Sequence, residues 1–129
     1  MSVPLYTPYE MINKLVSFDT TSRNSNLDLI NFVSDYLSQH GVKSHIVADG
    51  SGTKANLLAT IGPNVDGGIM LSGHTDVVPV DGQHWDTNPF TATKANGRIY
   101  GRGTADMKSF SGIFLADLPR FVKARLKRP

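Results

Sequence analysis

Apolar residues recur at helical spacing in three stretches of the chain, residues 8–17, 25–40 and 107–126. They stand three or four positions apart in each stretch, so the pattern predicts three amphipathic helices. Gly41 is a stop signal for the second helix, and Pro119 should kink or split the third. The apolar sets are Met11, Ile12, Leu15 and Val16; Leu27, Ile30, Phe32, Val33 and Leu37; and Phe110, Ile113, Phe114, Leu118, Phe121 and Val122.

Four shorter stretches have the composition of strands. They are residues 42–48, 56–61, 69–72 and 98–100. Glycine-containing turn signals follow or precede them at 49–52, 62–63 and 96–97. Residues 69–72 are almost continuously apolar, so we expect a strand buried on both faces. Helices on either side of strands favour an α/β fold of three layers, helix–sheet–helix, with part of a mixed, mostly parallel sheet.

Composition narrows the class of protein. The 129 residues suit one domain or part of one, and 40% hydrophobic with 19% charged residues is typical of a globular chain. Lys and Arg total 13 against 11 Asp and Glu, a net charge of +2 that is too small to indicate a nucleic-acid partner. No apolar run reaches the roughly 18–20 residues that span a membrane. Without a leader-like N-terminus, we expect a soluble cytoplasmic protein.

Two counts limit the chemistry. The chain has no cysteine, so a metal ion would have to be held by histidine and carboxylate side chains. It has a single glutamate, Glu10, in the first predicted helix and far in sequence from the candidate site described next. A mechanism that needs a glutamate as base or metal ligand therefore requires a glutamate from another chain or from a part of the protein that is absent here.

The first candidate site segment is Ser72-Gly73-His74-Thr75-Asp76, directly after the predicted strand 69–72. In a strand, side chains two positions apart lie on the same side, so His74 and Asp76 can converge. A carboxylate beside a histidine can accept the ring N–H and leave the other nitrogen free for a metal. A loop histidine with a local hydrogen bond fits the same three letters, so this pattern alone leaves both interpretations open.

The second candidate segment is Gly101-Arg102-Gly103-Thr104-Ala105-Asp106-Met107-Lys108, just before the third helix. Asp106 stands where a helix N-cap is expected, and aspartate is a favoured capping residue. The two glycines lack the third glycine and the long preceding strand of a dinucleotide-binding fingerprint. For Arg102 and Lys108 we expect a solvated or helix-capping role, with contact to an anionic substrate as the alternative.

Together the two segments resemble the two signatures of the M20 family of zinc amidohydrolases and peptidases. Trp85-Asp86-Thr87-Asn88-Pro89-Phe90 is similar to the stretch between those signatures, and residues 17–22 are similar to the segment after the family's first helix. The resemblance thus covers nearly the whole chain. Val77-Val78-Pro79-Val80 and residues 101–108 are most similar to the acetylornithine deacetylase branch of this family.

The resemblance implies a role for each matching residue. His74 is similar to the ligand of one zinc, Asp106 to the aspartate that bridges two zincs, and Asp76 to the catalytic-site carboxylate that orients the histidine. The family's Glu-Glu pair, a further acidic ligand and a late histidine have no counterpart here. We therefore expect residues 1–129 to form the N-terminal part of a zinc-peptidase-like catalytic domain, truncated, with the dimerisation domain and the C-terminal half absent.

The implied reaction is metal-assisted hydrolysis of an amide, with two Zn²⁺ ions, or Co²⁺ as a substitute, and a glutamate base. The implied substrate is a small N-acyl amino acid, N-acetylornithine, hydrolysed to ornithine and acetate in arginine biosynthesis. A related M20 activity, a succinyl-diaminopimelate desuccinylase or a carboxypeptidase, and a non-catalytic remnant are the alternatives. Because the base is lacking, we expect this chain by itself to be nearly inactive.

The pattern also predicts how the chain behaves in solution. The third helix has an apolar stripe that needs a sheet to cover it, and one sheet edge lacks the strand that should pair with it. We therefore expect marginal folding or self-association of the purified chain. Size exclusion with light scattering and thermal melting test this expectation. A monodisperse monomer that melts cooperatively above about 60 °C, the upper part of the usual mesophilic range, would contradict it.

Overall fold

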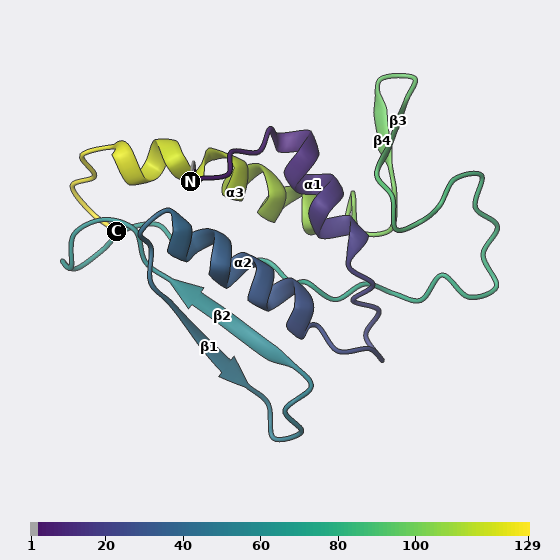
Figure 1. Cartoon of the computed structure of the whole chain (residues 1–129), viewed down its shortest axis with the longest axis horizontal. Helices are drawn as coiled ribbons and strands as arrows, with labels where there is room; N and C mark the ends of the chain where they lie inside the picture. The colour runs from purple at the N-terminus through teal and green to yellow at the C-terminus, as the bar shows by residue number, and fades with distance from the viewer. Residues whose placement is uncertain (1–2) are drawn as a thin grey trace.

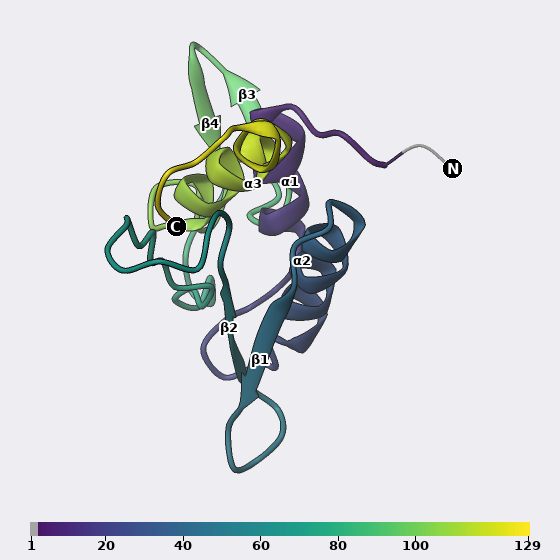
Figure 2. The same ribbon diagram turned by 90° about the vertical axis from the view of Figure 1, so that its left-hand side faces the viewer.

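The computed structural model of the chain describes residues 3–129 (Figure 1). Helices α1 and α3 lie side by side, α2 lies beneath them, and the β1–β2 hairpin lies on the other side of α2 (Figures 1 and 2). A second hairpin, β3–β4, projects away from the helices. The elements are α1 (Pro8–Ser17), α2 (Leu27–Gln39), β1 (Ser44–Ala48), β2 (Ala55–Ala59), β3 (Thr93–Ala95), β4 (Arg98–Tyr100) and α3 (Lys108–Lys123).

Helix α1 begins with a capping box that uses the only glutamate of the chain. The Thr7 hydroxyl accepts a hydrogen bond from the Glu10 amide at 3.3 Å, and Glu10 Oε2 accepts one from the Thr7 amide at 2.8 Å. Pro8 occupies the first turn, where its missing N–H costs no helical hydrogen bond. These hydrogen bonds from Thr7 lower the pKa of Glu10 and hold its carboxylate at the end of α1.

The α/β class predicted from the sequence is confirmed, and its strands form two small antiparallel sheets. In the larger sheet Ser44 pairs with Ala59 and Ala48 with Ala55. Asn26 joins this hairpin to α2, because its side-chain amide both accepts from the Ala55 amide and donates to the Ala55 carbonyl at 2.9 Å. Of the expected parallel pairing, the described residues contain one isolated bridge, between Thr21 and Val77.

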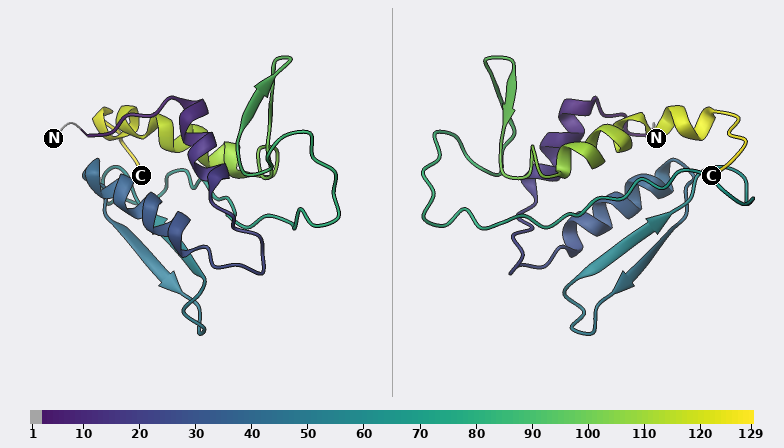
Figure 3. Two further views of the ribbon diagram at one scale, coloured as in Figure 1. Left: turned by 45° about the vertical axis from the view of Figure 1, so that its right-hand side comes forward. Right: turned by 180° about the vertical axis from the view of Figure 1, so that it is seen from behind.

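The predicted strand at residues 69–72 is wrong. These residues lie in the long connection between β2 and β3, which runs across the molecule without regular secondary structure apart from the Thr21–Val77 bridge (Figure 3). Ile69 and Met70 are 83% and 82% exposed, so the expected burial on both faces is also wrong. A strand needs a neighbour to accept its backbone hydrogen bonds, and none of the described residues pairs with this stretch as a strand.

Helix α3 forms where the sequence predicts it, but only part of its expected apolar stripe, Leu118 and in part Phe114, packs against the core. Lys108, Gly112, Leu115 and Leu118 are its buried residues, while Phe110 and Ile113 of the predicted apolar stripe are exposed. The helix continues through Pro119 and is not split there. The packing partner explains the choice of face, because the α3 surface that contains Gly112 lets α1 come close.

The main core lies where the three helices and the start of β2 meet. Its buried apolar residues are Met11, Leu15, Leu29, Ile30, Tyr36, Leu37, Val42, Ala55, Leu115 and Leu118. Gly112 allows the closest approach within this packing, since a Cβ at this position would stand 2.8 Å from Ile12 Cγ1 and 3.1 Å from Ile12 Cα. No helix within residues 3–129 is long and apolar enough to cross a membrane.

We predict that Gly112→Ala destabilises the protein even though alanine is the better helix former. The added methyl group must displace the α1 backbone at Ile12, and such overpacking costs about 1–3 kcal/mol, against a gain in helix propensity of about 1 kcal/mol. Chemical denaturation of the two proteins measures the difference. Gly50→Ala is the control, because a Cβ there meets nothing within 4 Å. A stability increase in Gly112→Ala would show that the helices are not packed this closely.

Candidate metal centre

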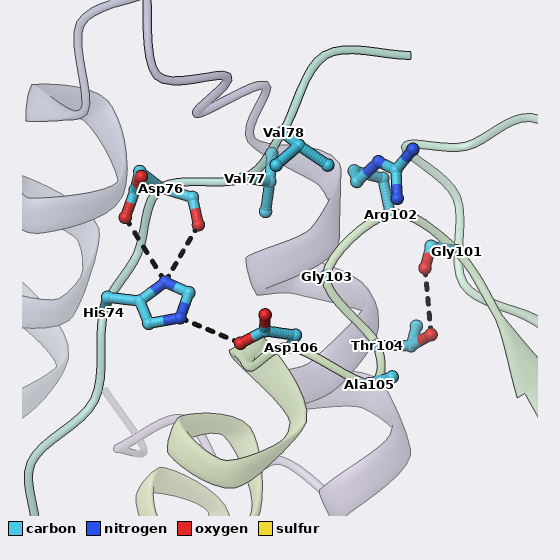
Figure 4. A pocket seen from close by; sticks show the side chains of 10 residues that line it. All are labelled: His74, Asp76, Val77, Val78, Gly101, Arg102, Gly103, Thr104, Ala105 and Asp106. Carbon is cyan, nitrogen blue, oxygen red and sulfur yellow. Dashed lines mark hydrogen bonds and ion pairs between the residues drawn. The ribbon is translucent and has the colours of Figure 1, made fainter. Parts of the chain in front are cut away.

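The three residues proposed from the sequence lie together in one pocket of about 210 Å³ (Figure 4). His74 Nε2 stands 2.8 Å from Asp106 Oδ1, and His74 Nδ1 stands 3.2 Å from Asp76 Oδ1 and 3.0 Å from the Asp76 carbonyl oxygen. The His74 ring thus lies between two carboxylates that come from segments 30 residues apart in the sequence. The pocket is lined by residues 74, 76–78 and 101–106.

The local structure separates two interpretations that the sequence leaves open for Asp106. Helix α3 begins at Lys108, its N-cap is Met107, and no side chain caps it. Asp106 therefore does not cap the helix. Its side chain is 84% exposed and turns toward His74, at the end of a loop whose Asp106–Met107 peptide bond is cis.

His74 has acceptors on both ring nitrogens, and this sets its protonation. The doubly protonated imidazolium can donate to Asp106 and to Asp76 at once, whereas the neutral ring can satisfy only one side. The hydrogen bond with the Asp106 carboxylate, followed by the one with the Asp76 backbone, raises the pKa of His74 above its ordinary value of 6.5. A proton on Nε2 therefore occupies the position from which that nitrogen would bind a metal ion.

Ser22 is a site residue that sequence reasoning did not assign. Its hydroxyl donates to Asp76 Oδ2 at 2.9 Å, so both oxygens of Asp76 are engaged, one by His74 and one by Ser22. Ser22 lies in the turn after α1, 54 positions before Asp76. The only sequence signal was its place in the polar stretch 17–22 that resembles the M20 segment, and that stretch gave no residue a role.

Lys108 differs from the expectation of a solvated or capping side chain. It is 2% exposed, and its ammonium group donates to the Phe18 carbonyl at 2.8 Å. Burial lowers the pKa of Lys108 to about 8, and the nearby Asp19 carboxylate opposes this shift. Lys108 therefore ties the start of α3 to the end of α1 and does not face the pocket as a free cation.

Arg102 lines the pocket, and its guanidinium lies over the Trp85 ring with 5.1 Å from Cζ to the ring centroid. It also donates to the Gln83 side chain.

The other histidines and the glutamate lie apart from the pocket. His84 pairs with Asp86 on the surface, where the two side chains are 89% and 93% exposed. The His40 ring packs against Tyr36 with 4.6 Å between centroids, and His45 is exposed on β1. Glu10 is held by Thr7 in the α1 cap. None of these four side chains lines the pocket.

The donor set fits a zinc ion in kind but not in number. An imidazole nitrogen and a carboxylate oxygen converge, and a second carboxylate stands 3.2 Å from the other ring nitrogen; zinc sites often combine such groups. Yet no group of three or more His, Asp or Glu side chains placed to hold a metal is found within residues 3–129. A stable zinc site usually has three or four protein ligands. His74 and Asp106 would thus be part of a site, and the remaining donors would come from outside these residues.

Comparisons with known proteins concern the sequence of the chain. Residues 70–129, which include His74, Asp76 and Asp106, match the family model described as Peptidase family M20/M25/M40. An acetylornithine deacetylase from Pasteurella multocida (strain Pm70) is 40% identical over 114 residues, which are 88% of this chain and 30% of that protein. One from Shigella sonnei (strain Ss046) is 42% identical over 106 residues, 81% of this chain and 27% of that protein. The chain spans about 30% of the length of these relatives, and the resemblance to the M20 family is confirmed.

The raised pKa of His74 gives a prediction with a definite sign. A group whose pKa is higher in the folded state stabilises the fold below its unfolded pKa, near 6.5, and loses this contribution as pH rises through the folded value. We expect an NMR titration to place the pKa of His74 above 6.5, and Asp106→Asn to lower it because the amide cannot stabilise the ring charge. Asp86→Asn, beside the surface residue His84, is the matched control. An unchanged pKa of His74 in Asp106→Asn would contradict the arrangement in Figure 4.

Proposed function

We propose that this chain, an M20 family segment, supplies part of the metal centre of an amide hydrolase. The observation that supports the proposal most directly is that His74 Nε2 and Asp106 Oδ1 converge at 2.8 Å while Asp76 engages the other ring nitrogen. An arrangement of this kind fixes the direction of His74 Nε2, the nitrogen that would bind a metal ion after losing its proton.

The roles follow from the contacts of each residue. His74 would bind one metal ion through Nε2, Asp76 would accept the Nδ1 proton and hold the ring, and Asp106 would give one or both carboxylate oxygens. Zn²⁺, or Co²⁺ in its place, would supply polarisation of the amide carbonyl and a lowered pKa for a water nucleophile when it is bound. The Asp106 side chain is 84% exposed and that of His74 is 47% exposed. A metal ion held by these two residues could therefore also be bound by ligands from another segment or molecule.

Proton transfer is the part of the reaction that these residues do not provide. Hydrolysis of an amide needs a base that takes a proton from water and returns it to the leaving amine. The only glutamate of the chain is engaged with Thr7, and Asp76 already bonds to His74 and Ser22. We infer that the chain alone hydrolyses amides very slowly and that the reaction needs a base that these 129 residues do not supply.

For the substrate we propose a small N-acyl amino acid, with N-acetylornithine as the first choice. The support is the name that both relatives carry, together with 40% and 42% identity over most of this chain. The reaction would convert N-acetylornithine and water to ornithine and acetate, as a step of arginine biosynthesis. Its place would be the cytoplasm.

We predict that the purified chain binds zinc weakly and through His74. The chain provides only two protein donors for the metal. Calorimetry at neutral pH should therefore give a Kd weaker than about 1 µM, a much lower affinity than that of complete structural zinc sites. His74→Ala should remove the binding, and His84→Ala should leave it unchanged because that histidine is a surface residue outside the pocket. Nanomolar binding that is lost in His74→Ala would reveal further ligands. Binding that is equal in both variants would contradict the proposed site.

A further inference from the structure

We propose that Ser22 is a positioning residue of this site, one that holds the Asp76 carboxylate in one orientation and thereby supports the orientation of the His74 ring. The inference rests on the proposed function, in which His74 is a metal ligand. It assigns a role to the turn after α1, a segment that holds none of the proposed ligands. The contacts run in one line from Ser22 Oγ to Asp76 Oδ2, from Asp76 Oδ1 to His74 Nδ1, and from His74 Nε2 to Asp106.

The first step of the argument is the freedom of an aspartate side chain. Rotation of an aspartate side chain about Cα–Cβ has three staggered wells, and rotation about Cβ–Cγ is broad, so contacts must select both the rotamer and the carboxylate plane. Asp76 is 57% exposed, so packing alone cannot hold it. His74 Nδ1 hydrogen-bonds to the Asp76 backbone carbonyl at 3.0 Å and stands 3.2 Å from Oδ1 as an ion pair, so the hydrogen bond from Ser22 at 2.9 Å is the one that restrains the carboxylate. The carboxylate can therefore turn only by breaking the hydrogen bond from Ser22 and lengthening the ion pair with His74.

The second step is that the backbone holds Ser22 in place for this contact. The Ser22 amide donates to the Val77 carbonyl at 3.0 Å, and the Val77 amide donates to the Thr20 carbonyl at 3.1 Å. Thr20 and Val77 are almost fully buried, with 2% and 3% exposure. This parallel pairing places Ser22 beside Asp76 in a fixed register. The backbone therefore already holds the hydroxyl within reach of the carboxylate.

Side-chain hydrogen bonds from Lys54, Lys108 and Thr21 also hold this turn in place. The Lys54 ammonium donates to the Ser22 carbonyl at 2.9 Å, and Lys108 donates to the Phe18 carbonyl at 2.8 Å. Asp19 accepts from both the amide and the hydroxyl of Thr21, which closes the turn on itself. The turn is thus a rigid support for the Ser22 hydroxyl.

The hydroxyl has one other acceptor, and its geometry is poorer. Ser22 Oγ is 3.4 Å from the Val77 carbonyl oxygen, near the limit for a hydrogen bond and 0.5 Å longer than its 2.9 Å contact with Asp76. The Val77 carbonyl already accepts from the Ser22 amide. The Ser22 hydroxyl is therefore not needed to close the turn, and its better contact is with the site.

The experiment compares three variants of the full chain. Ser22→Ala removes the hydroxyl, Ser22→Thr keeps it, and Ser25→Ala removes a hydroxyl from the same connection, where Ser25 accepts only from the Leu27 amide among the contacts of the described residues. Zinc is titrated to millimolar concentration while NMR follows the His74 ring signals, which measures a weak Kd. In the metal-free proteins, three-bond couplings of the Asp76 β-protons report whether its side chain keeps one rotamer. Thermal melting shows whether each variant is folded.

We expect Ser22→Ala to weaken zinc binding about tenfold, the lower end of the effect of losing a residue that orients a ligand. The Asp76 couplings of this variant should be those of a side chain that exchanges between rotamers. Ser22→Thr and Ser25→Ala should keep the wild-type Kd within about threefold and keep a single rotamer, since neither loses the contact to Asp76. A Ser22→Ala protein with the wild-type Kd and one Asp76 rotamer would overturn the proposal. If the wild type shows no saturable effect of zinc on His74, the proposed metal function fails, and the rotamer comparison still decides the role of Ser22.

Discussion

The structure of the site depends on the hydrogen bonds between residues 20–22 and residues 75–77. Forming them closes a long loop, since Ser22 and Asp76 stand 54 positions apart. Loop closure of this kind has an entropic cost that grows slowly with length, so the contacts must be buried and well aligned to persist. The bridge meets this requirement because Thr21 and Val77 are almost fully buried. It brings the turn after α1 to the segment of His74, and Lys108 brings α3 with Asp106 to the same turn.

The elements that the sequence predicted well are those with local causes. Helix α1 carries its own cap in Thr7, Pro8 and Glu10, and the Asn96-Gly97 pair makes the turn between β3 and β4. The proximity of His74, Asp76 and Asp106 was expected from a family resemblance and is seen in the geometry, whereas their roles as ligand and orienter stay predictions. His-X-Asp and an aspartate before a helix were not sufficient by themselves to place the pocket.

The features that sequence reasoning missed depend on contacts between distant segments. Residues 69–72 have the composition of a buried strand, but a strand is defined by its neighbours, and composition cannot supply them. For Lys108 the sequence predicts a solvated or capping residue, yet the side chain is buried and its ammonium group donates to the Phe18 carbonyl. Helix α3 has apolar residues on more than one face, so only the approach of α1 at Gly112 decides which face is buried.

The stacking of Arg102 on Trp85 has a practical consequence. Trp85 is the only tryptophan of the chain, so the indole emission of the protein comes from one known place. Its neighbour Arg102 lines the pocket that holds His74 and Asp106. A molecule that enters the pocket and moves the guanidinium changes the polarity around the indole. We therefore expect the emission of Trp85 to report entry of a molecule into the pocket, without an added label or catalytic turnover.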